Sequence, residues 1–229
     1  MIDLHSHILP GMDDGSETPE MTQTLLRMMQ EQGVEAVFAT PHFYAHKDTP
    51  AEFLRRREAA VARMYPVEGG PEVLLGAEVA YFDGMSRVRE LEALQLGNSG
   101  LLLVEMPFGA WSQRMIRELC ELPIQLGLTP VLAHVERYRR RDQLPKFQQL
   151  LMAQGICFQC NAEAFLSVWE RNWALGMLRR GAVQFLGSDA HNLTTRAPKL
   201  AQAAAVIIKK LGADALDVIT NEAKELLKI

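Results

Sequence analysis

The most regular feature of this chain is an alternation of short apolar runs with longer amphipathic stretches. The apolar runs are MIDLH (1–5), VEAVFAT (34–40), EVLLGAE (72–78), GLLLVEM (100–106), PVLAHV (130–135), ICFQCN (156–161) and AVQFLGSDAH (182–191). The amphipathic stretches have helical periodicity and cover 19–32, 50–64, 84–95, 112–127, 142–154, 163–180, 196–211 and 213–227. Apolar strands that alternate with helices are typical of a parallel sheet covered by helices. The pattern therefore predicts an α/β fold built from seven strand–helix units.

No linker rich in proline, glycine or serine interrupts this alternation, so we expect residues 1–229 to form a single domain. A chain of 229 residues suits a TIM-like barrel of parallel strands, which reaches this size as one domain. In such a barrel the carboxyl ends of the strands meet at one mouth, where active sites lie. We therefore expect the functional residues at that mouth.

The composition disfavours several classes of protein and partner. The net charge of −4 gives no reason to expect a nucleic-acid or anionic-membrane partner. No apolar run approaches the roughly 18 residues of a membrane-spanning helix, and MIDLHSH lacks the features of a secretion signal. We therefore expect a cytoplasmic protein without membrane insertion. No motif indicates its oligomeric state.

The chain has three cysteines, an odd number that suits a reducing compartment better than a disulfide framework. Cys157 and Cys160 form a C-x-x-C motif, but they fall within a predicted strand. Residues three apart on a strand face opposite sides, so the two thiols are not expected to share a metal ion. We interpret them as buried core residues.

A polar residue stands at or just beyond the end of every predicted strand. These residues, spaced by roughly one strand–helix unit, are His5, His42, Glu78, Glu105, His134, Asn161 and Asp189. Residues two apart on a strand point to the same face, so His5 and His7 can direct both imidazoles at one point. Most of the histidines then collect at the mouth together with carboxylates. Scattered surface histidines would not show this regularity.

The candidate metal ligands are His5, His7, Asp14, His42, Glu78, Glu105, His134, Asp189 and His191. Glu78 and Glu105 end very apolar strands, where a metal ion or a salt bridge to arginine would compensate a buried carboxylate. Taken singly, His42 or His134 could be a hydrogen-bonded core histidine, and His191 could belong to a helix cap. Their matching positions favour a shared site.

This number of ligands exceeds the need of one ion and predicts two or three, with Glu78 or Asp189 available as a bridge. Oxygen and nitrogen ligands without thiolate favour manganese, iron, zinc or magnesium. Three divalent ions outweigh four carboxylates in charge, so the site would attract a phosphate dianion. Such clusters also supply hydroxide near neutral pH. His46 lacks a strand-end position and is expected to be a solvated loop residue.

Six motifs, DLHSHILPGMDDG, TPHF, GAEV, LVEMP, AHVERY and SDAHNLTTRAP, resemble in order and spacing those of the PHP (polymerase and histidinol phosphatase) superfamily. More narrowly, HILPGMDDG, AHVERY and SDAHN are similar to those of bacterial capsule- and exopolysaccharide-associated manganese-dependent protein tyrosine phosphatases. The resemblance covers residues 1 to about 200. It implies a distorted seven-stranded (β/α) barrel with three metal ions, manganese being expected.

The resemblance also implies a role for each candidate residue. The three ions would be held by His5, His7, Glu78 and Asp189, by Glu78, Glu105 and His134, and by Asp14, His42 and His191. Arg137 in HVERY and Arg196 in NLTTRAP match positions that face the substrate phosphate. Segment 161–178 departs from the family pattern, because it is compact and lacks a longer glycine-containing stretch. This departure affects the rim, and with it substrate preference, but none of the candidate ligands.

These observations predict a metal-dependent phosphatase, in particular a protein tyrosine phosphatase that regulates capsular or extracellular polysaccharide synthesis. The expected substrate is a phosphotyrosine protein, for which a polysaccharide-assembly tyrosine kinase is one candidate. Phe43, Tyr44, Phe108 and Trp111 in strand-end loops could wall an aromatic substrate, although core packing explains each of them singly.

The cysteine mechanism of tyrosine dephosphorylation needs an arginine six residues after the nucleophile. Cys120, Cys157 and Cys160 are followed at that distance by Leu126, Glu163 and Leu166, so this mechanism is excluded.

Other functions stay open as alternatives. One is a PHP-type phosphatase of a small ester such as histidinol phosphate. Another is a non-catalytic metal-binding regulator, although such a protein would be expected to have lost ligands. A nuclease is disfavoured, because a single basic run, RYRRR (137–141), in an acidic protein is typical of a solvated helix start.

Overall fold

The computed structural model describes residues 1–140 and 142–229, so Arg141 of the RYRRR run lies outside the described residues. The strands are Ile2–Ser6 (β1), Ala36–Ala39 (β2), His42–Phe43 (β3), Glu72–Leu75 (β4), Glu78–Ala80 (β5), Leu101–Glu105 (β6), Thr129–Leu132 (β7), Cys157–Asn161 (β8) and Phe185–Gly187 (β9). The α-helices are Pro19–Glu31 (α1), Pro50–Val61 (α2), Gln113–Leu126 (α3), Leu144–Ala153 (α4), Ala162–Leu166 (α5), Arg171–Arg179 (α6), Leu200–Leu211 (α7) and Ala213–Leu227 (α8). The 3-10 helices are Met85–Arg87 (η1), Arg89–Leu94 (η2) and Val135–Tyr138 (η3).

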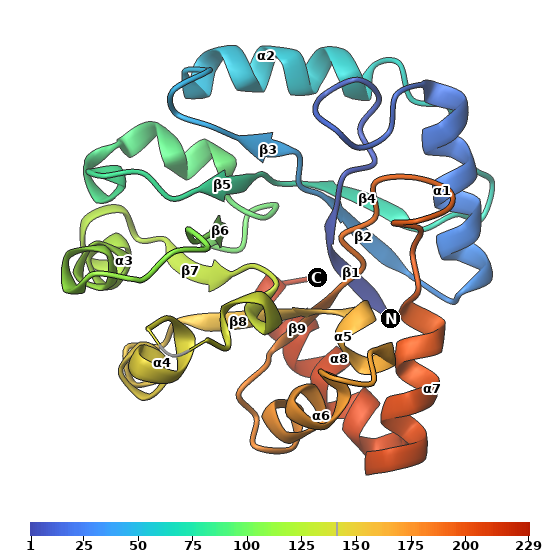
Figure 1. Cartoon of the computed structure of the whole chain (residues 1–229). Coiled ribbons are helices and arrows are strands. Elements are labelled where there is room, and N and C mark those ends of the chain that lie inside the picture. Colours follow the sequence, from blue (N-terminus) through green and yellow to red (C-terminus); the bar gives the residue numbers. More distant parts are fainter. Residues whose placement is uncertain (141) are drawn as a thin grey trace.

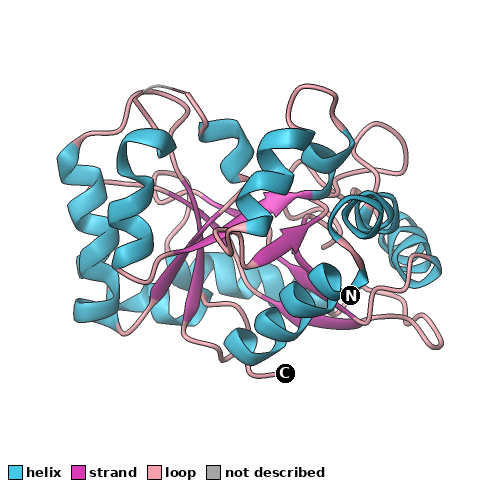
Figure 2. Cartoon of the chain, turned by 90° about the horizontal axis from the view of Figure 1, so that it is seen from below, coloured by secondary structure: helices cyan, strands magenta, loops and turns pink. Residues whose placement is uncertain are grey.

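The paired strands run parallel, in the orders β1-β2-β4 and β3-β5-β6-β7-β8-β9. The segment after β9 returns to β1, where Ser6 pairs with Ala190 and the Asp189 N–H donates to the His5 carbonyl at 2.7 Å. The strands curl around a common centre and the helices lie outside them (Figures 1 and 2). The predicted α/β fold with a parallel sheet is confirmed.

Two of the predicted strands are interrupted near their carboxyl ends. β2 and β3 are separated at Thr40 and Pro41, where proline has no N–H for the ladder. The run EVLLGAE is likewise divided into β4 and β5 at Gly76, where an added Cβ would lie 2.7 Å from Leu96 Cδ2. The short strands that follow pair His42 directly with Glu78. The interruptions therefore set two candidate ligands side by side.

The helix starts agree with local sequence signals. Thr18 accepts a hydrogen bond from the Met21 N–H at the start of α1, and Pro19 occupies the first helical position. Thr49 and Glu52 form a reciprocal capping box at the start of α2. These caps satisfy backbone donors that have no partner within the helix.

The prediction of one helix over 163–180 is wrong, because the structure has α5 and α6 with a break at 167–170. Ser167 has an extended backbone, with ψ 130°. Arg171 Nε donates to the Phe165 carbonyl at 2.9 Å, and its Nη2 donates to the Leu166 carbonyl at 2.8 Å. This side chain therefore satisfies carbonyls that a continuous helix would pair with backbone N–H groups.

The stretch 84–95 is helical, as predicted, and forms the 3-10 helices η1 and η2. Two predicted boundaries differ, at the start of α7 and at the end of β7. Helix α7 begins at Leu200 rather than at residue 196. Pro198 disfavours helical backbone in the residue before it, which explains the later start. β7 ends at Leu132 because His134 takes a left-handed conformation with φ 34° and starts η3.

The sheet packs apolar side chains on both faces. Leu102 and Val104 of β6 belong to the larger core cluster, which includes helix residues such as Leu119. Leu101 and Leu103 belong to a second cluster, which α8 closes with Leu227. Since alternate residues share a face, Glu105 continues the line of Leu103. The candidate ligands thus lie at the carboxyl end of the second cluster. Within the described part of the chain, no helix is long and apolar enough to span a membrane.

Candidate metal centre

The predicted metal ligands lie in one polar cluster at the carboxyl ends of the strands. In chain order they come from β1 and the following loop (His5, His7, Asp14), β3 (His42), β5 (Glu78), β6 (Glu105), the turn after β7 (His134) and the segment after β9 (Asp189, His191). Apart from His134, each contributes an atom to a group whose ligand atoms lie within 4.8 Å of one another. The structure therefore brings these residues together, while their individual roles as ligands stay predictions.

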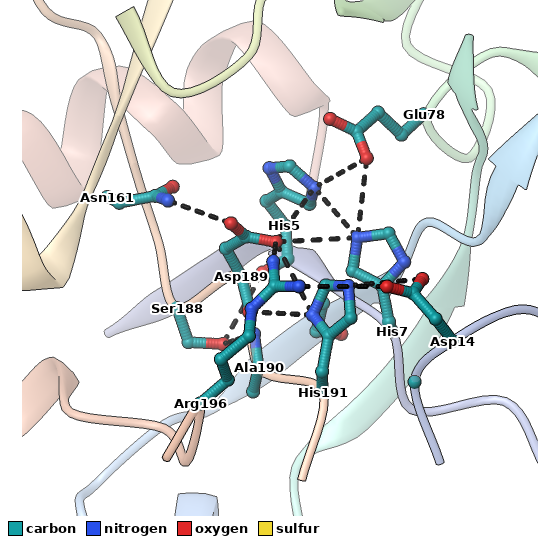
Figure 3. A network of polar contacts seen from close by, with 12 residues as sticks. His5, His7, Asp14, Glu78, Asn161, Ser188, Asp189, Ala190, His191 and Arg196 are labelled. Atoms are coloured by element: carbon teal, nitrogen blue, oxygen red, sulfur yellow. Dashed lines mark hydrogen bonds and ion pairs between the residues drawn. The ribbon is translucent and has the colours of Figure 1, made fainter. Parts of the chain in front are cut away.

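The deepest part of the cluster contains His5, His7 and Asp189, all of them buried. The Nε2 atoms of His5 and His7 are 3.1 Å apart and lie 3.7 and 3.5 Å from Asp189 Oδ1. Glu78 Oε2 lies 3.2 Å from His5 Nε2 and 3.3 Å from His7 Nε2. Figure 3 shows these side chains directed at one point. They make up one of the sets that the family resemblance implies for a single ion.

Glu78 connects this part to the other ligands. Its Oε2 lies 2.9 Å from His42 Nδ1. Its other oxygen, Oε1, lies 2.9 Å from His134 Nε2, and that nitrogen lies 3.3 Å from Glu105 Oε1. The two oxygens of Glu78 thus face different histidines, as a bridging carboxylate requires.

Asp14 closes the cluster on the solvent side. Its Oδ1 lies 3.6 Å from His42 Nε2 and 3.5 Å from His191 Nε2, and its side chain is 65% exposed. The loop that carries Asp14 packs directly on the end of β1, because a Cβ added to Gly15 would lie 2.1 Å from the His7 carbonyl oxygen. The absence of a side chain at Gly15 therefore allows Asp14 to reach the cluster.

The carboxylates raise the pKa of neighbouring histidines. Burial lowers the pKa of His7, but its contacts with Asp13 and Glu78 outweigh this effect and raise it to about 10. Burial also lowers the pKa of His134, and its hydrogen bonds with Glu105 and Glu78 raise it to about 9. Burial raises the pKa of Glu78, but the surrounding histidines hold it well below its ordinary value. The cluster thus favours positive charge beside its carboxylates, which metal ions supply when they displace protons.

His191 provides a direct test of whether the cluster fits a cation. Its Nδ1 donates to the Asp189 carbonyl at 2.9 Å, so Nε2 of the neutral ring carries a lone pair. Burial lowers the pKa of His191 to about 4, which keeps the ring neutral at pH 7. Its buried Nε2 has no hydrogen-bond partner among the described residues. A buried acceptor without a partner is costly, and a divalent cation would satisfy it.

Arg137 and Arg196 lie over the cluster and contact Asp189 from two sides. Arg137 Nη2 is 2.5 Å from Asp189 Oδ2, and Arg196 Nη2 is 2.8 Å from Asp189 Oδ1. Arg196 Nη1 also lies 3.8 Å from Asp14 Oδ2, so this guanidinium spans the two carboxylates (Figure 3). Arg137 therefore pairs with Asp189 rather than with the neighbouring Glu136. Both arginines are about one-third exposed and reachable from solvent.

The sequence did not indicate several residues that hold the ligands in place. Asp13 Oδ2 lies 2.7 Å from His7 Nδ1 and accepts from the His42 N–H at 2.9 Å. Gln159, which is buried in β8, contacts two further candidate ligands. Asn161, which the sequence placed at a strand end but not among the candidate ligands, donates to Asp189 at 3.0 Å. The polar residue Gln159 within the apolar run ICFQCN was the available signal.

The aromatic residues proposed to wall the substrate separate into two groups. Phe43 and Trp111 are buried core residues, which confirms core packing, the explanation favoured for each of them singly. Phe108 is 59% exposed, and its ring stacks beside His134 at a centroid distance of 6.1 Å. Tyr44 stacks on His42 at 5.3 Å and lines a cavity of about 410 Å³ that opens beside Asp14.

His46 is exposed in the loop before α2, and no potential metal-binding group within the described residues includes it, as predicted.

The cysteines lie outside the cluster and are unpaired. Cys157 and Cys160 belong to different apolar clusters, which confirms that they face opposite sides of the sheet. Burial raises the pKa of Cys157 to about 11 and that of Cys160 well above its ordinary value. Neither thiol is therefore a candidate nucleophile.

Comparisons with known proteins agree with this site. A family profile described as "Capsular polysaccharide synthesis, CpsB/CapC" matches residues 1–228. The chain is 32% identical over 243 residues to tyrosine-protein phosphatase CpsB of Streptococcus pneumoniae, spanning 99% of this chain and 94% of the relative. It is 27% identical over 234 residues to tyrosine-protein phosphatase YwqE of Bacillus subtilis (strain 168), spanning 100% and 92%.

A solved structure is similar over the whole chain. It comes from a study of YwqE from Bacillus subtilis and CpsB from Streptococcus pneumoniae, described as unique metal-dependent tyrosine phosphatases. The TM-score is 0.86 at 26% identity, and the match covers 100% of this chain and 94% of the solved one. The resemblance predicted from the motifs is thereby confirmed, and the chain belongs to the CpsB/CapC family of capsular polysaccharide synthesis.

Proposed function

We propose that this protein is a metal-dependent protein tyrosine phosphatase that acts in the regulation of capsular or extracellular polysaccharide synthesis. The observation that carries the proposal is the convergence of histidine and carboxylate side chains at one place, where the buried Nε2 of His191 has no hydrogen-bond partner among the described residues. Curated relatives that match nearly the whole chain are tyrosine-protein phosphatases. Cys157 and Cys160 lack the chemistry of a thiol nucleophile, which supports the metal cluster as the reactive centre.

The proposed centre holds three divalent ions, with manganese favoured over iron, zinc or magnesium. Three overlapping groups of side chains would hold them: His5, His7, Glu78 and Asp189; Glu78, Glu105 and His134; and Asp14, His42 and His191. The contacts within each group support this division. Donors restricted to nitrogen and oxygen suit these metals. When bound, the ions supply a water-derived nucleophile and neutralise charge on the phosphoryl group.

The arginines and aromatic residues supply the rest of the proposed site. Arg137 and Arg196 approach the cluster from solvent, and their planar guanidinium groups match pairs of phosphate oxygens. We assign them to binding the phosphate and stabilising negative charge as the ester bond breaks. Phe108 and Tyr44 flank the opening and are positioned to contact the aromatic ring of the substrate. The phenol leaving group has a pKa of about 10 and therefore needs little acid assistance.

We also infer that the curled sheet is a distorted seven-stranded (β/α) barrel and that residues 1–229 form one domain. The short strands β3 and β5 continue the lines of β2 and β4, and the pairing of Ser6 with Ala190 joins the last strand to the first. The match of one family profile to residues 1–228 agrees with a single domain. A cytoplasmic location and a polysaccharide-assembly tyrosine kinase as substrate stay predictions.

Hydrolysis rates on a phosphotyrosine peptide, a phosphoserine peptide and histidinol phosphate test the proposal. We expect the phosphotyrosine peptide to react fastest, activity to disappear after strong chelation and return with Mn²⁺, and thiol alkylation to leave it unchanged. Faster turnover of histidinol phosphate would reassign the substrate. Loss of activity on alkylation with the metal still bound would refute the metal-centred chemistry.

A further inference from the structure

Gln159 is a fully buried amide in β8 that joins three candidate ligands. Its Oε1 accepts from the His134 backbone N–H at 2.7 Å and lies 3.1 Å from His5 Nδ1. Its Nε2 donates to Asn161 Oδ1 at 2.8 Å. Asn161 Nδ2 in turn donates to Asp189 Oδ2 at 3.0 Å (Figure 3). Two side-chain amides thus link His5, His134 and Asp189.

The direction of this chain of hydrogen bonds is fixed at one end. A backbone N–H can only donate, so the group facing the His134 N–H must be the oxygen of Gln159. Gln159 Nε2 then faces Asn161, which must present its own oxygen there and its NH₂ group to Asp189. Asp189 Oδ2 is consequently placed as an acceptor of this hydrogen bond.

The same direction determines which nitrogen of His5 carries the proton. Gln159 Oε1 has a second lone pair and no proton to give, so His5 Nδ1 must be the donor in their contact. In the neutral ring Nε2 then has a free lone pair. That atom is the one that faces His7, Glu78 and Asp189.

The backbone at Gly187 lies close to the Gln159 side chain. A Cβ added to Gly187 would lie 2.7 Å from Gln159 Nε2 and 2.7 Å from His5 Cβ. Gly187 has no positive φ, so a side chain there would be disfavoured by steric clash and not by backbone conformation. The absence of a side chain at Gly187 therefore leaves the space that the amide of Gln159 occupies.

We propose that Gln159 is a positioning residue of the metal centre, which holds His5 in the tautomer with a free Nε2 and orients His134 and Asp189. This inference rests on the proposed metal-ligand roles of those three residues. Histidine ligands of metal ions commonly donate their second N–H to an acceptor, and loss of that acceptor typically costs about 10- to 100-fold in metal affinity. Here one amide serves ligands of two proposed ions.

Two substitutions separate the effects of hydrogen bonding and shape. Gln159→Met has a similar unbranched side chain without donor or acceptor, and we expect it to weaken Mn²⁺ binding by about 10- to 100-fold. Gln159→Glu keeps an acceptor for His5 and His134 but cannot donate to Asn161, so its affinity should lie between those of wild type and Gln159→Met.

Gln184→Met is the matched control. Gln184 also accepts from a β8 backbone N–H, that of Phe158 at 2.9 Å, and donates to the Gly181 carbonyl, away from the ligands. This substitution should leave metal affinity unchanged.

The measurements are Mn²⁺ affinity by chelator competition and ¹⁵N-histidine NMR of the metal-free protein, with His5 assigned through His5→Ala. We expect a proton on Nδ1 of His5 in wild type and in Gln159→Glu, and its transfer to Nε2 in Gln159→Met. Wild-type affinity and an unchanged His5 proton in Gln159→Met would overturn the proposal, as would equal losses in Gln184→Met. If His5→Ala retained every ion bound by wild type, the ligand assignment would fail and the positioning role with it.

Discussion

The inner and outer parts of the proposed metal centre are built differently. The inner ligands His5, His7 and Glu78 are at most 1% exposed, and His5 and His7 have hydrogen-bonding contacts beyond the cluster, with Gln159 and Asp13. The Asp14 side chain on the outer side is 65% exposed and contacts the cluster and Arg196 at 3.5 to 3.8 Å.

This difference follows from where the residues lie in the chain. The inner ligands project from paired strands or directly follow them, whereas Asp14 lies in the loop before α1. The fold therefore holds the inner side chains by contacts outside the cluster, and we expect a bound ion to contribute more to the position of Asp14. Substitutions in the two parts should consequently differ in their effects on metal content and rate.

The largest effect is expected from Glu78→Gln, in the inner part. A bridging carboxylate lies between two ions, and its amide would leave their mutual repulsion uncompensated. We expect metal content to fall and kcat/KM to drop by about 1000-fold or more. His46→Ala, a control in an exposed loop, should keep the parent rate and metal content. Similar losses in the two variants would mean that strand-end position does not identify the ligands.

A smaller effect is expected from Arg137→Ala, which removes the guanidinium group that contacts Asp189 on the solvent side of the cluster. If Arg137 binds phosphate, the variant should keep its metal while kcat/KM falls by about 10- to 1000-fold. Arg137→Lys should recover only part of this loss, because an ammonium cannot hold two oxygens in one plane. Steady-state kinetics and a metal count for each variant provide the test. Reduced metal content would instead make Arg137 a support for Asp189.

Asp14→Asn tests the outer part, with an expected loss of about 10-fold in metal affinity. The asparagine amide keeps an oxygen ligand but removes the negative charge. Because this position is exposed, a water molecule can also take the place of the side-chain ligand. Chelator competition should show a reduced affinity for one ion and unchanged affinities for the others. If the affinities for all ions fell together, the outer and inner parts would not be independent.

The smallest effect concerns stability and pH in the metal-free protein. The pKa values of His7 and His134, raised to about 10 and about 9, mean that their protons stabilise the fold fully below about 6.5. That contribution is lost as pH rises through these values. The Tm of metal-free protein should therefore fall from pH 7 to pH 10, on the order of 10 °C. Protein saturated with Mn²⁺ should show less change over pH 7 to 9. An equal fall in both forms over pH 7 to 9 would place the titrating groups elsewhere.

The sequence predicted that the candidate ligands lie together because most of them stand at or just beyond a strand end. It could not predict Gln159, whose role depends on contacts with residues 25 and 154 positions away. Nor could it predict that Arg137 pairs with Asp189, 52 positions along the chain. The division of 163–180 into α5 and α6 was missed for a similar reason. A helical pattern does not reveal that Arg171 will satisfy the carbonyls at the end of α5.

The pairing of Ser6 with Ala190 has a consequence for biosynthesis. His5 and His7 leave the ribosome early, but Asp189 and His191, which lie beside them in the fold, emerge more than 180 residues later. Contacts between such distant segments form late, because closing long loops is entropically costly. A nascent chain that has not yet released His191 therefore lacks part of the cluster, and capture of the full set of ions would mark the completion of folding.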